Sequence, residues 1–139
     1  MTQRDLDVVV FGATGVTGRR VAAYLADRNA VTGARWAAAG REAARLRCVL
    51  EYDGVQAPEV LVADVSDPAS LAAMASRTAV VLNLVGPYTV HGRPVVEACV
   101  DAGTHYVDLT GEIPFVRQMV EQVHDRARDT GVKVVQACG

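Results

Sequence analysis

Three glycines stand three residues apart near the N-terminus of this 139-residue sequence. They are Gly12, Gly15 and Gly18 of the stretch FGATGVTGRR, directly after the apolar run LDVVVF. A glycine turn between a strand and a helix lets backbone N–H groups approach the phosphates of a dinucleotide, where a Cβ would block them. We expect a tight turn at Gly12, approach of a pyrophosphate at Gly15 and close packing of the helix at Gly18.

The neighbouring positions complete the expected phosphate site. Thr14 and Val16 would supply backbone N–H groups, and the Thr17 hydroxyl would add a donor. Arg19 and Arg20 follow directly, and one of them is expected to assist. The spacing GxxGxxG departs from the GxGxxG fingerprint, so a glycine-rich turn that serves packing alone is the alternative interpretation.

The stretch AAAGR, at the end of the second expected strand, bears on the choice of nicotinamide cofactor. An NAD site usually has Asp or Glu there, which binds the ribose 2′-OH. Here Gly40 leaves space, and Arg41 offers a planar cation suited to a 2′-phosphate, while Glu42 is expected to point away along the helix. The sequence therefore favours NADP(H) over NAD(H), and a solvated residue at a helix start is the alternative for Arg41.

Two further strand ends carry candidate cofactor contacts. Asp64 follows EVLVA and is expected to accept a hydrogen bond from the adenine amine, with a loop or cap role as the alternative. Gly86 and Pro87 of NLVGPY are expected to fix a turn whose backbone faces the nicotinamide-side ribose, with a plain strand-to-helix turn as the alternative. No pair of titratable residues stands out as acid and base, so the catalytic residues are unknown.

The elements that must position these residues alternate along the chain. Continuous apolar runs indicate buried parallel strands, and apolar residues three or four apart indicate helices. We predict one α/β domain over residues 1–139, a Rossmann-type doubly wound parallel sheet of six strands in the order 3-2-1-4-5-6 with helices on both faces. Strands are expected at residues 6–11, 35–39, 59–63, 79–84, 105–109 and 132–137, with helices at 16–28, 41–52, from 67, at 92–102 and from 113 to 131.

Composition excludes several functional classes. Half of the residues are hydrophobic and the net charge is −2, so a nucleic-acid partner is not expected. The scattered histidines and cysteines lack the spacing of metal ligands, so no metal site is expected. The N-terminal MTQRDLD has no apolar signal core, which favours a cytoplasmic location, with any membrane association made through a part that this chain lacks.

Four stretches together resemble a known family. With GATGVTG, AAAGR, NLVGPY and GTHYVDLTGE, the chain is similar to the NADP-binding N-terminal domain of saccharopine dehydrogenase-like oxidoreductases, which include the trans-acting enoyl reductases of bacterial lipid synthesis. The likeness is strongest over residues 83–112 and covers essentially the whole chain. The resemblance implies cofactor contacts at Gly12, Thr14, Gly15, Val16, Thr17, Arg41, Asp64, Gly86 and Pro87.

The resemblance also bears on the far end of the fifth strand. It implies that Asp108, Thr110, Gly111 and Glu112 face the active-site cleft. Helix capping is the alternative for Asp108 and Glu112, because TGE precedes an apolar helical run.

The resemblance implies that the intact protein continues beyond the strand VKVVQACG into a C-terminal substrate and dimerisation domain, which we expect to be absent from this chain. The resemblance implies an NADP-dependent oxidoreductase in the intact protein, a reductase of a lipid or other small carbonyl or enoyl substrate, with this fragment inactive alone. A non-catalytic NADP-binding sensor or partner module is the alternative. The short-chain dehydrogenase pair of Tyr with Lys four residues later is absent, because Lys133 follows Asp129.

The expected absence of that domain leads to one expectation about assembly. An apolar sheet edge or face near residues 132–137 should be exposed, because whatever follows it in the family is missing. Such edges pair with copies of themselves, so we expect a homo-oligomer.

Overall fold

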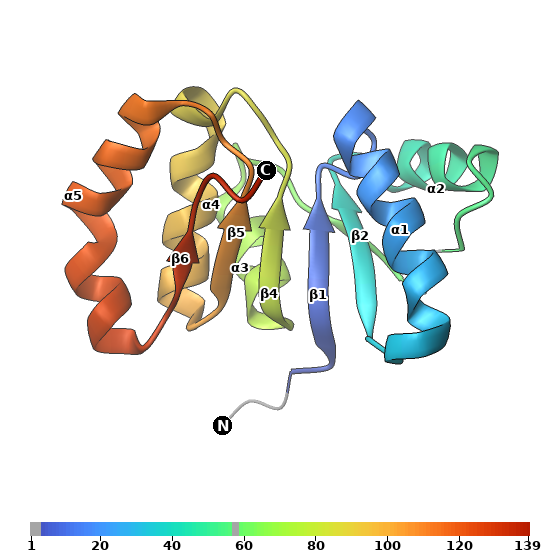
Figure 1. Cartoon of the computed structure of the whole chain (residues 1–139), viewed down its shortest axis with the longest axis horizontal. Helices are drawn as coiled ribbons and strands as arrows, with labels where there is room; N and C mark the ends of the chain where they lie inside the picture. Colours follow the sequence, from blue (N-terminus) through green and yellow to red (C-terminus); the bar gives the residue numbers. More distant parts are fainter. Residues whose placement is uncertain (1–3, 57–58) are drawn as a thin grey trace.

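The chain folds as an alternation of strands and helices. Over residues 4–56 and 59–139, the part that the computed structural model describes, six strands alternate with five helices (Figure 1). The strands are β1 (Leu6–Phe11), β2 (Trp36–Gly40), β3 (Val60–Val62), β4 (Thr78–Asn83), β5 (His105–Asp108) and β6 (Val134–Val135). The helices are α1 (Val16–Thr32), α2 (Ala43–Tyr52), α3 (Pro68–Ser76), α4 (Tyr88–Ala102) and α5 (Ile113–Thr130).

All strands pair in parallel, and their order is β3-β2-β1-β4-β5-β6, which confirms the predicted topology. β1 lies in the middle of the sheet, where Val9 and Val10 have no exposed surface. Because β1 pairs with β2 on one side and with β4 on the other, the strand order reverses between β1 and β4. Their C-terminal ends therefore lie side by side at the place where doubly wound sheets bind ligands.

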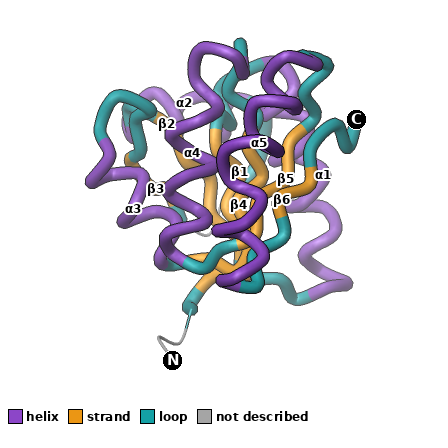
Figure 2. Tube along the Cα trace, turned by 90° about the vertical axis from the view of Figure 1, so that its left-hand side faces the viewer, coloured by secondary structure: helices purple, strands orange, loops and turns teal. Residues whose placement is uncertain are grey.

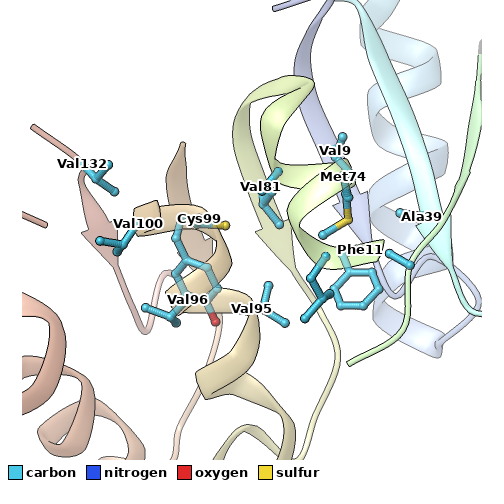
Figure 3. Close-up of a cluster of buried hydrophobic side chains, with 14 of the residues drawn as sticks. Val9, Phe11, Ala39, Met74, Val81, Val95, Val96, Cys99, Val100 and Val132 are labelled. Carbon is cyan, nitrogen blue, oxygen red and sulfur yellow. The ribbon is translucent and has the colours of Figure 1, made fainter. Parts of the chain in front are cut away.

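Helices pack on both faces of the sheet. Right-handed crossovers place α1 and α2 on one face and α3, α4 and α5 on the other, and Figure 2 gives the view from the side. On the α3–α5 face, Val9, Val81 and Val96 belong to one continuous apolar core (Figure 3). On the α1/α2 face, Trp36 and Leu46 belong to a second, smaller core over β1, β2 and β3.

The α1/α2 face is open over the other half of the sheet. In Figure 1, α1 stands on the β2 side of β1, and its residues pack with those of β1 and β2, whereas no helix of the described residues stands in front of β4, β5 and β6. The strand register places Val80 beside Val8, and it places Leu82, Val107 and Val135 in a row that begins at Val10. Val80, Leu82 and Val107 are half-buried, and Val135 is 44% exposed. We call these residues the open face: Val80, Leu82, Val107 and Val135.

Helix boundaries depart from prediction where distant residues act on them. α4 begins at Tyr88, earlier than the predicted residue 92. Gly92 instead lies inside α4, where a Cβ would be 2.5 Å from Phe115 Cζ, so the glycine lets α5 approach α4. α1 continues past residue 28 to Thr32, where Gly33 ends it in the left-handed conformation.

Two strands also differ from prediction. β6 spans only Val134–Val135, shorter than the predicted 132–137, because Val132 turns into the α3–α5 core. β2 includes Gly40, which pairs with Val62, and α2 therefore starts at Ala43 rather than at residue 41. The other boundaries agree closely with prediction.

Candidate functional site

A cleft of about 290 Å³ opens at the C-terminal edge of the sheet, where β1 and β4 end. It lies between the β1–α1 turn, the end of β2 and the loop that joins β4 to α4, and we call it the β1/β4 cleft. The residues that line it are Phe11, Gly12, Thr14, Gly15, Gly40, Arg41, Val65, Leu84, Val85, Gly86 and His91.

Gly12 makes the turn that directs the chain from β1 into α1. Its φ is +91°, a backbone conformation that residues with a Cβ rarely adopt. A Cβ there would lie 2.9 Å from Val85 Cγ2 and 3.1 Å from the carbonyl carbon of Leu84, so the turn is in contact with the β4–α4 loop. The two walls of the cleft are thus packed against each other at Gly12.

Gly18 and Gly15 are small for different reasons. A Cβ on Gly18 would overlap the Gly12 carbonyl group and lie 2.7 Å from Ala13 Cα, so packing of α1 on the turn requires glycine there. A Cβ on Gly15 would meet only the Gly12 carbonyl oxygen, at 3.5 Å. Since the protein itself leaves that room, the space that a side chain at Gly15 would take is space in the cleft.

The N-terminus of α1 opens beside the cleft with its positive end uncovered. Gly15 is its N-cap residue, and among the described residues no side chain caps the helix and no acidic residue lies in its first turn. Val16 and Thr17 are exposed at its start, outside the cleft lining. Free N–H groups and the helix dipole together favour an anion at such a position.

The two arginines of the first α1 turns lie away from the cleft lining. Arg19 forms a bidentate ion pair with Asp53, with 2.6 Å between Nε and Oδ2. The hydrogen bonds from Arg19 hold the pKa of Asp53 below its usual value. Arg20 lines a separate surface hollow together with Arg19. The structure therefore gives Arg19 a partner at the end of α2.

Arg41 stands at the opposite end of the cleft, directly after β2. It is exposed and lines the cleft together with Gly40. A Cβ on Gly40 would be 3.7 Å from Leu46 Cδ2, its nearest neighbour, so the strand end is roomy as predicted. Glu42 is the N-cap residue of α2 and does not line the cleft, and within the described residues no side chain caps this helix.

Asp64 has a local partner. Its Oδ1 accepts hydrogen bonds from the backbone N and the hydroxyl of Ser66, at 2.8 and 2.7 Å. These bonds lower the pKa of the Asp64 carboxyl group, with smaller contributions from Arg41 and His91. Val65 lines the cleft where Asp64 does not, so the alternative role of Asp64 in its loop has direct support and its adenine contact stays a prediction.

The β4–α4 loop is held from beneath by Asn83. The Asn83 side chain accepts a bond from Val85 N at 3.1 Å and donates to the Tyr106 hydroxyl at 3.1 Å. The Tyr88 hydroxyl donates to the Asn83 carbonyl oxygen at 3.0 Å. Gly86 lines the cleft at the end of this loop, whereas Pro87 is the N-cap residue of α4 and lies outside the lining.

Asp108 is buried and does not line the β1/β4 cleft. Its Oδ2 accepts a bond from the Tyr106 hydroxyl at 2.7 Å, and its Oδ1 accepts from Thr110 N and Ala137 N, each at 3.0 Å. Burial and the neighbouring Asp108 raise the pKa of Tyr106. Asp108 therefore joins the chain after β6 to the end of β5.

Glu112 is the N-cap residue of α5, but its side chain makes no hydrogen bond to that helix and caps α4 instead. Its carboxylate accepts hydrogen bonds from Tyr88 N at 2.6 Å and from Thr89 N at 2.9 Å, the first two residues of α4. The Thr89 hydroxyl donates a further bond at 2.6 Å. These bonds lower the pKa of Glu112, with the Thr89 hydroxyl as the largest cause.

His91 is a cleft residue that the sequence analysis did not single out. It lies in the first turns of α4 and lines the same cleft as Arg41 and Val65. No motif spacing marks it, because its position depends on where α4 begins. Clusters of His, Cys, Asp and Glu that could hold a metal are absent from the residues the structure describes, and none of their helices is long and apolar enough to span a bilayer.

The sequence profile described as the saccharopine dehydrogenase NADP binding domain matches residues 8–135, nearly the whole of the sheet and its helices. The chain belongs to this family. The fold and the cleft agree with that assignment, because a dinucleotide-binding domain requires a phosphate-accepting turn at the strand reversal. The predicted family and the predicted cofactor class, NADP, are both confirmed.

Curated relatives are trans-acting enoyl reductases. The chain is 48% identical over 139 residues to one from Mycobacterium ulcerans, and the alignment covers 99% of this chain and 33% of that protein. It is 46% identical over 139 residues to a trans-acting enoyl reductase of Mycobacterium tuberculosis, again over 33% of that protein. The chain therefore spans about a third of the length of the curated relatives it matches.

Solved structures support the fold. Apo saccharopine dehydrogenase (L-Glu forming) from Saccharomyces cerevisiae superimposes with a TM-score of 0.76 at 22% identity, over 96% of this chain and 27% of that one. The Citrobacter triphenylmethane reductase complexed with NADP(H) superimposes with a TM-score of 0.63 at 25% identity, over 90% of this chain and 46% of that one.

Proposed function

We propose that the β1/β4 cleft of this chain binds NADP(H) and presents the nicotinamide to a substrate held by another part of a longer reductase. The observation that carries the proposal is Gly15, where the protein leaves room for a Cβ and the N-terminus of α1 is uncapped. Packing does not require glycine at that position. A bound pyrophosphate does, because it needs the backbone N–H groups at close range.

The pyrophosphate is proposed to lie on the β1–α1 turn. Gly12 makes the tight turn, Gly15 leaves room for the phosphates, and Gly18 lets α1 pack against the turn. Donors would come from the backbone N–H groups of Thr14 and Val16 and from the Thr17 hydroxyl, which all lie at or beside the cleft.

The adenosine 2′-phosphate is proposed to lie at Arg41. This side chain lines the cleft at the end of β2, and the neighbouring Gly40 leaves the strand end open. An NAD site would place a carboxylate there, but Glu42 is the N-cap residue of α2 and stands outside the lining. The adenine contact of Asp64 and the ribose contacts of Gly86 and Pro87 complete the proposed site.

The chemistry is proposed to be hydride transfer from NADPH to an enoyl substrate. Relatives that are 48% identical to this chain are named as trans-acting enoyl reductases or putative ones. The bound nicotinamide supplies the hydride, while this chain binds and orients the dinucleotide. Substrate and proton donor are assigned to the two thirds of the relatives' length that lies outside the match.

The open face supports the proposal of a further domain. Parallel sheets are almost always covered on both faces, yet Val80, Leu82, Val107 and Val135 remain half-buried or exposed. In the longer relatives we propose that chain beyond the matched third covers them and carries the substrate and dimerisation surfaces.

A non-catalytic NADP sensor or partner module remains the second candidate. It is favoured by the lack of an acid–base pair in the cleft lining, since among the described residues this lining contains His91 but no Asp, Glu, Tyr or Cys. The longer protein decides between them, because the reductase oxidises NADPH with an enoyl substrate and the sensor binds NADPH without turnover.

Calorimetric titration of the 139-residue chain with NADPH and NADH tests the proposal. We expect NADPH to bind more tightly, and the preference to disappear in Arg41→Ala, because the 2′-phosphate loses its cation. Arg47→Ala is the matched control, since this exposed α2 arginine lines a different surface hollow. Equal binding of both nucleotides, or a preference that survives Arg41→Ala, would contradict the assignment of the 2′-phosphate site.

A further inference from the structure

The N-terminus of α4 lies at the wall of the β1/β4 cleft and has no cap from its own segment. Pro87 is its N-cap residue and offers neither a side-chain oxygen nor an N–H group. The first helical N–H groups, at Tyr88 and Thr89, point out of the helix and need acceptors. Both are bound by Glu112, which comes from the loop between β5 and α5.

Glu112 is itself held in place. Its backbone N donates to the Thr110 hydroxyl at 3.1 Å, and Thr110 N donates to Asp108 Oδ1 at 3.0 Å. Asp108 and Thr110 are buried at the end of β5. The carboxylate therefore reaches α4 from a rigid base rather than from a free loop.

Two anchors thus enclose residues 84–87, of which Leu84, Val85 and Gly86 line the cleft. Asn83 holds the stretch on its N-terminal side through Val85 N, and Glu112 holds it on its C-terminal side through Tyr88 N. Val85 and Leu84 make the contact with Gly12. A shift of α4 would therefore move this wall against the phosphate turn.

The two helix N-termini at the cleft also differ in electrostatics. Among the described residues no side chain caps α1, whereas α4 has the carboxylate of Glu112 on its first two N–H groups. A negative charge at a helix N-terminus satisfies its dipole and repels a second anion. The phosphates of a dinucleotide are therefore directed to α1.

We propose that Glu112 is a positioning residue for the cofactor: it fixes residues 84–87 against the glycine turn and closes the N-terminus of α4 to phosphate. This inference rests on the proposed function of the β1/β4 cleft. It assigns Glu112 no contact with the substrate or with the reacting atoms of the cofactor.

The test compares two ligands on the same variants of the 139-residue chain. NADP⁺ spans the whole cleft, whereas adenosine 2′,5′-bisphosphate lacks the nicotinamide half, which the wall at residues 84–87 is proposed to face. For Glu112→Ala we expect a roughly tenfold weaker affinity for NADP⁺, the equivalent of about one charge-assisted hydrogen bond, and an unchanged affinity for the bisphosphate. Glu112→Gln keeps one acceptor oxygen and should recover part of the loss.

Glu121→Ala is the control, because Glu121 is exposed on α5 and pairs with Arg117 one turn away. Thermal unfolding of each variant checks that the fold is retained. Equal weakening of both ligands, or unchanged NADP⁺ affinity in both Glu112 variants, would overturn the positioning role. A wild-type chain that binds neither ligand would contradict the proposed function itself, and the inference on Glu112 would fall with it.

Discussion

Gly18 faces the carbonyl oxygen of Gly12 so closely that a Cβ on Gly18 would overlap it. Gly15, midway between them, has no such neighbour within 3.4 Å, because its nearest contact would be at 3.5 Å. The three glycines therefore fall into two classes, two that packing requires and one that it does not. This distinction leads to opposite predictions for two similar substitutions.

Gly18→Ala should destabilise the fold. The new methyl group has backbone as its nearest neighbours, and overpacking of this kind typically costs about 1–3 kcal/mol. Urea unfolding monitored by circular dichroism measures the change. A Gly18→Ala chain as stable as the wild type would show that α1 can move away from the turn.

Gly15→Ala should leave stability within about 1 kcal/mol of the wild type, since its φ of −74° is an ordinary one. It should nevertheless weaken NADP⁺ binding at least about tenfold, because the methyl group enters the space proposed for the pyrophosphate. Calorimetry on the same preparation measures both the affinity and its loss. An unchanged NADP⁺ affinity in Gly15→Ala would contradict the placement of the pyrophosphate on this turn.

Tyr106→Phe should destabilise the chain by about 1–3 kcal/mol. The Tyr106 hydroxyl lies between Asn83 Nδ2 and Asp108 Oδ2, and all three side chains are buried, so its removal leaves two polar groups without that partner. Tyr24→Phe is the matched control, because Tyr24 is 59% exposed. A similar unfolding midpoint for both variants would mean that the network adds nothing to stability.

Stability should fall on acidification below about pH 4. Ion pairs with Arg19 and Arg35 lower the pKa of Asp53 and Asp7 from the usual 3.8. A carboxyl with a depressed pKa stabilises the folded state fully above its unfolded pKa, and this contribution disappears as pH falls through the folded pKa. Urea midpoints at pH 7 and pH 3 measure the loss, and Asp53→Asn should show a smaller one. An equal loss in both chains would rule out a contribution from Asp53.

The edge strand β6 should mediate self-association. Val135 is 44% exposed on a strand whose outer edge is unpaired among the described residues. Light scattering at increasing concentration should show a dimer or a larger assembly, and Val135→Lys should shift it towards monomer, because a charge at an edge opposes pairing. A wild-type monomer at the highest concentration would contradict this expectation.

The sequence alone is sufficient to predict the topology and the glycine turn after β1. The second part of β1, Val8–Phe11, is a continuous apolar run because both of its faces are largely buried, and the glycines that follow it encode a local turn. Elements of this kind depend on neighbours in the chain, so their pattern is visible in one sequence. The same holds for α3, where Asp67 and Pro68 mark the start that the structure shows.

What the sequence did not reveal depends on long-range contacts. The local pattern predicts too late a start for α4, because the residue that caps this helix, Glu112, lies far along the chain. The sequence pattern predicts a helix start at Gly92, whereas in the structure this glycine lies inside α4 and leaves room for Phe115 of α5. His91 lines the cleft from the first turns of α4, which begins early, and the Asp108 side chain accepts a hydrogen bond from Ala137 N, far along the chain.

The most direct test of the NADP site is a map of backbone amide shifts of the ¹⁵N-labelled chain during titration with NADP⁺. We predict the largest shifts at Gly12, Gly15 and Val16, a second group at Gly40 and Arg41, and small shifts at the capped N–H groups of Tyr88 and Thr89. Shifts centred on the start of α4, or none at the glycine turn with NADP⁺ bound, would contradict the proposed site.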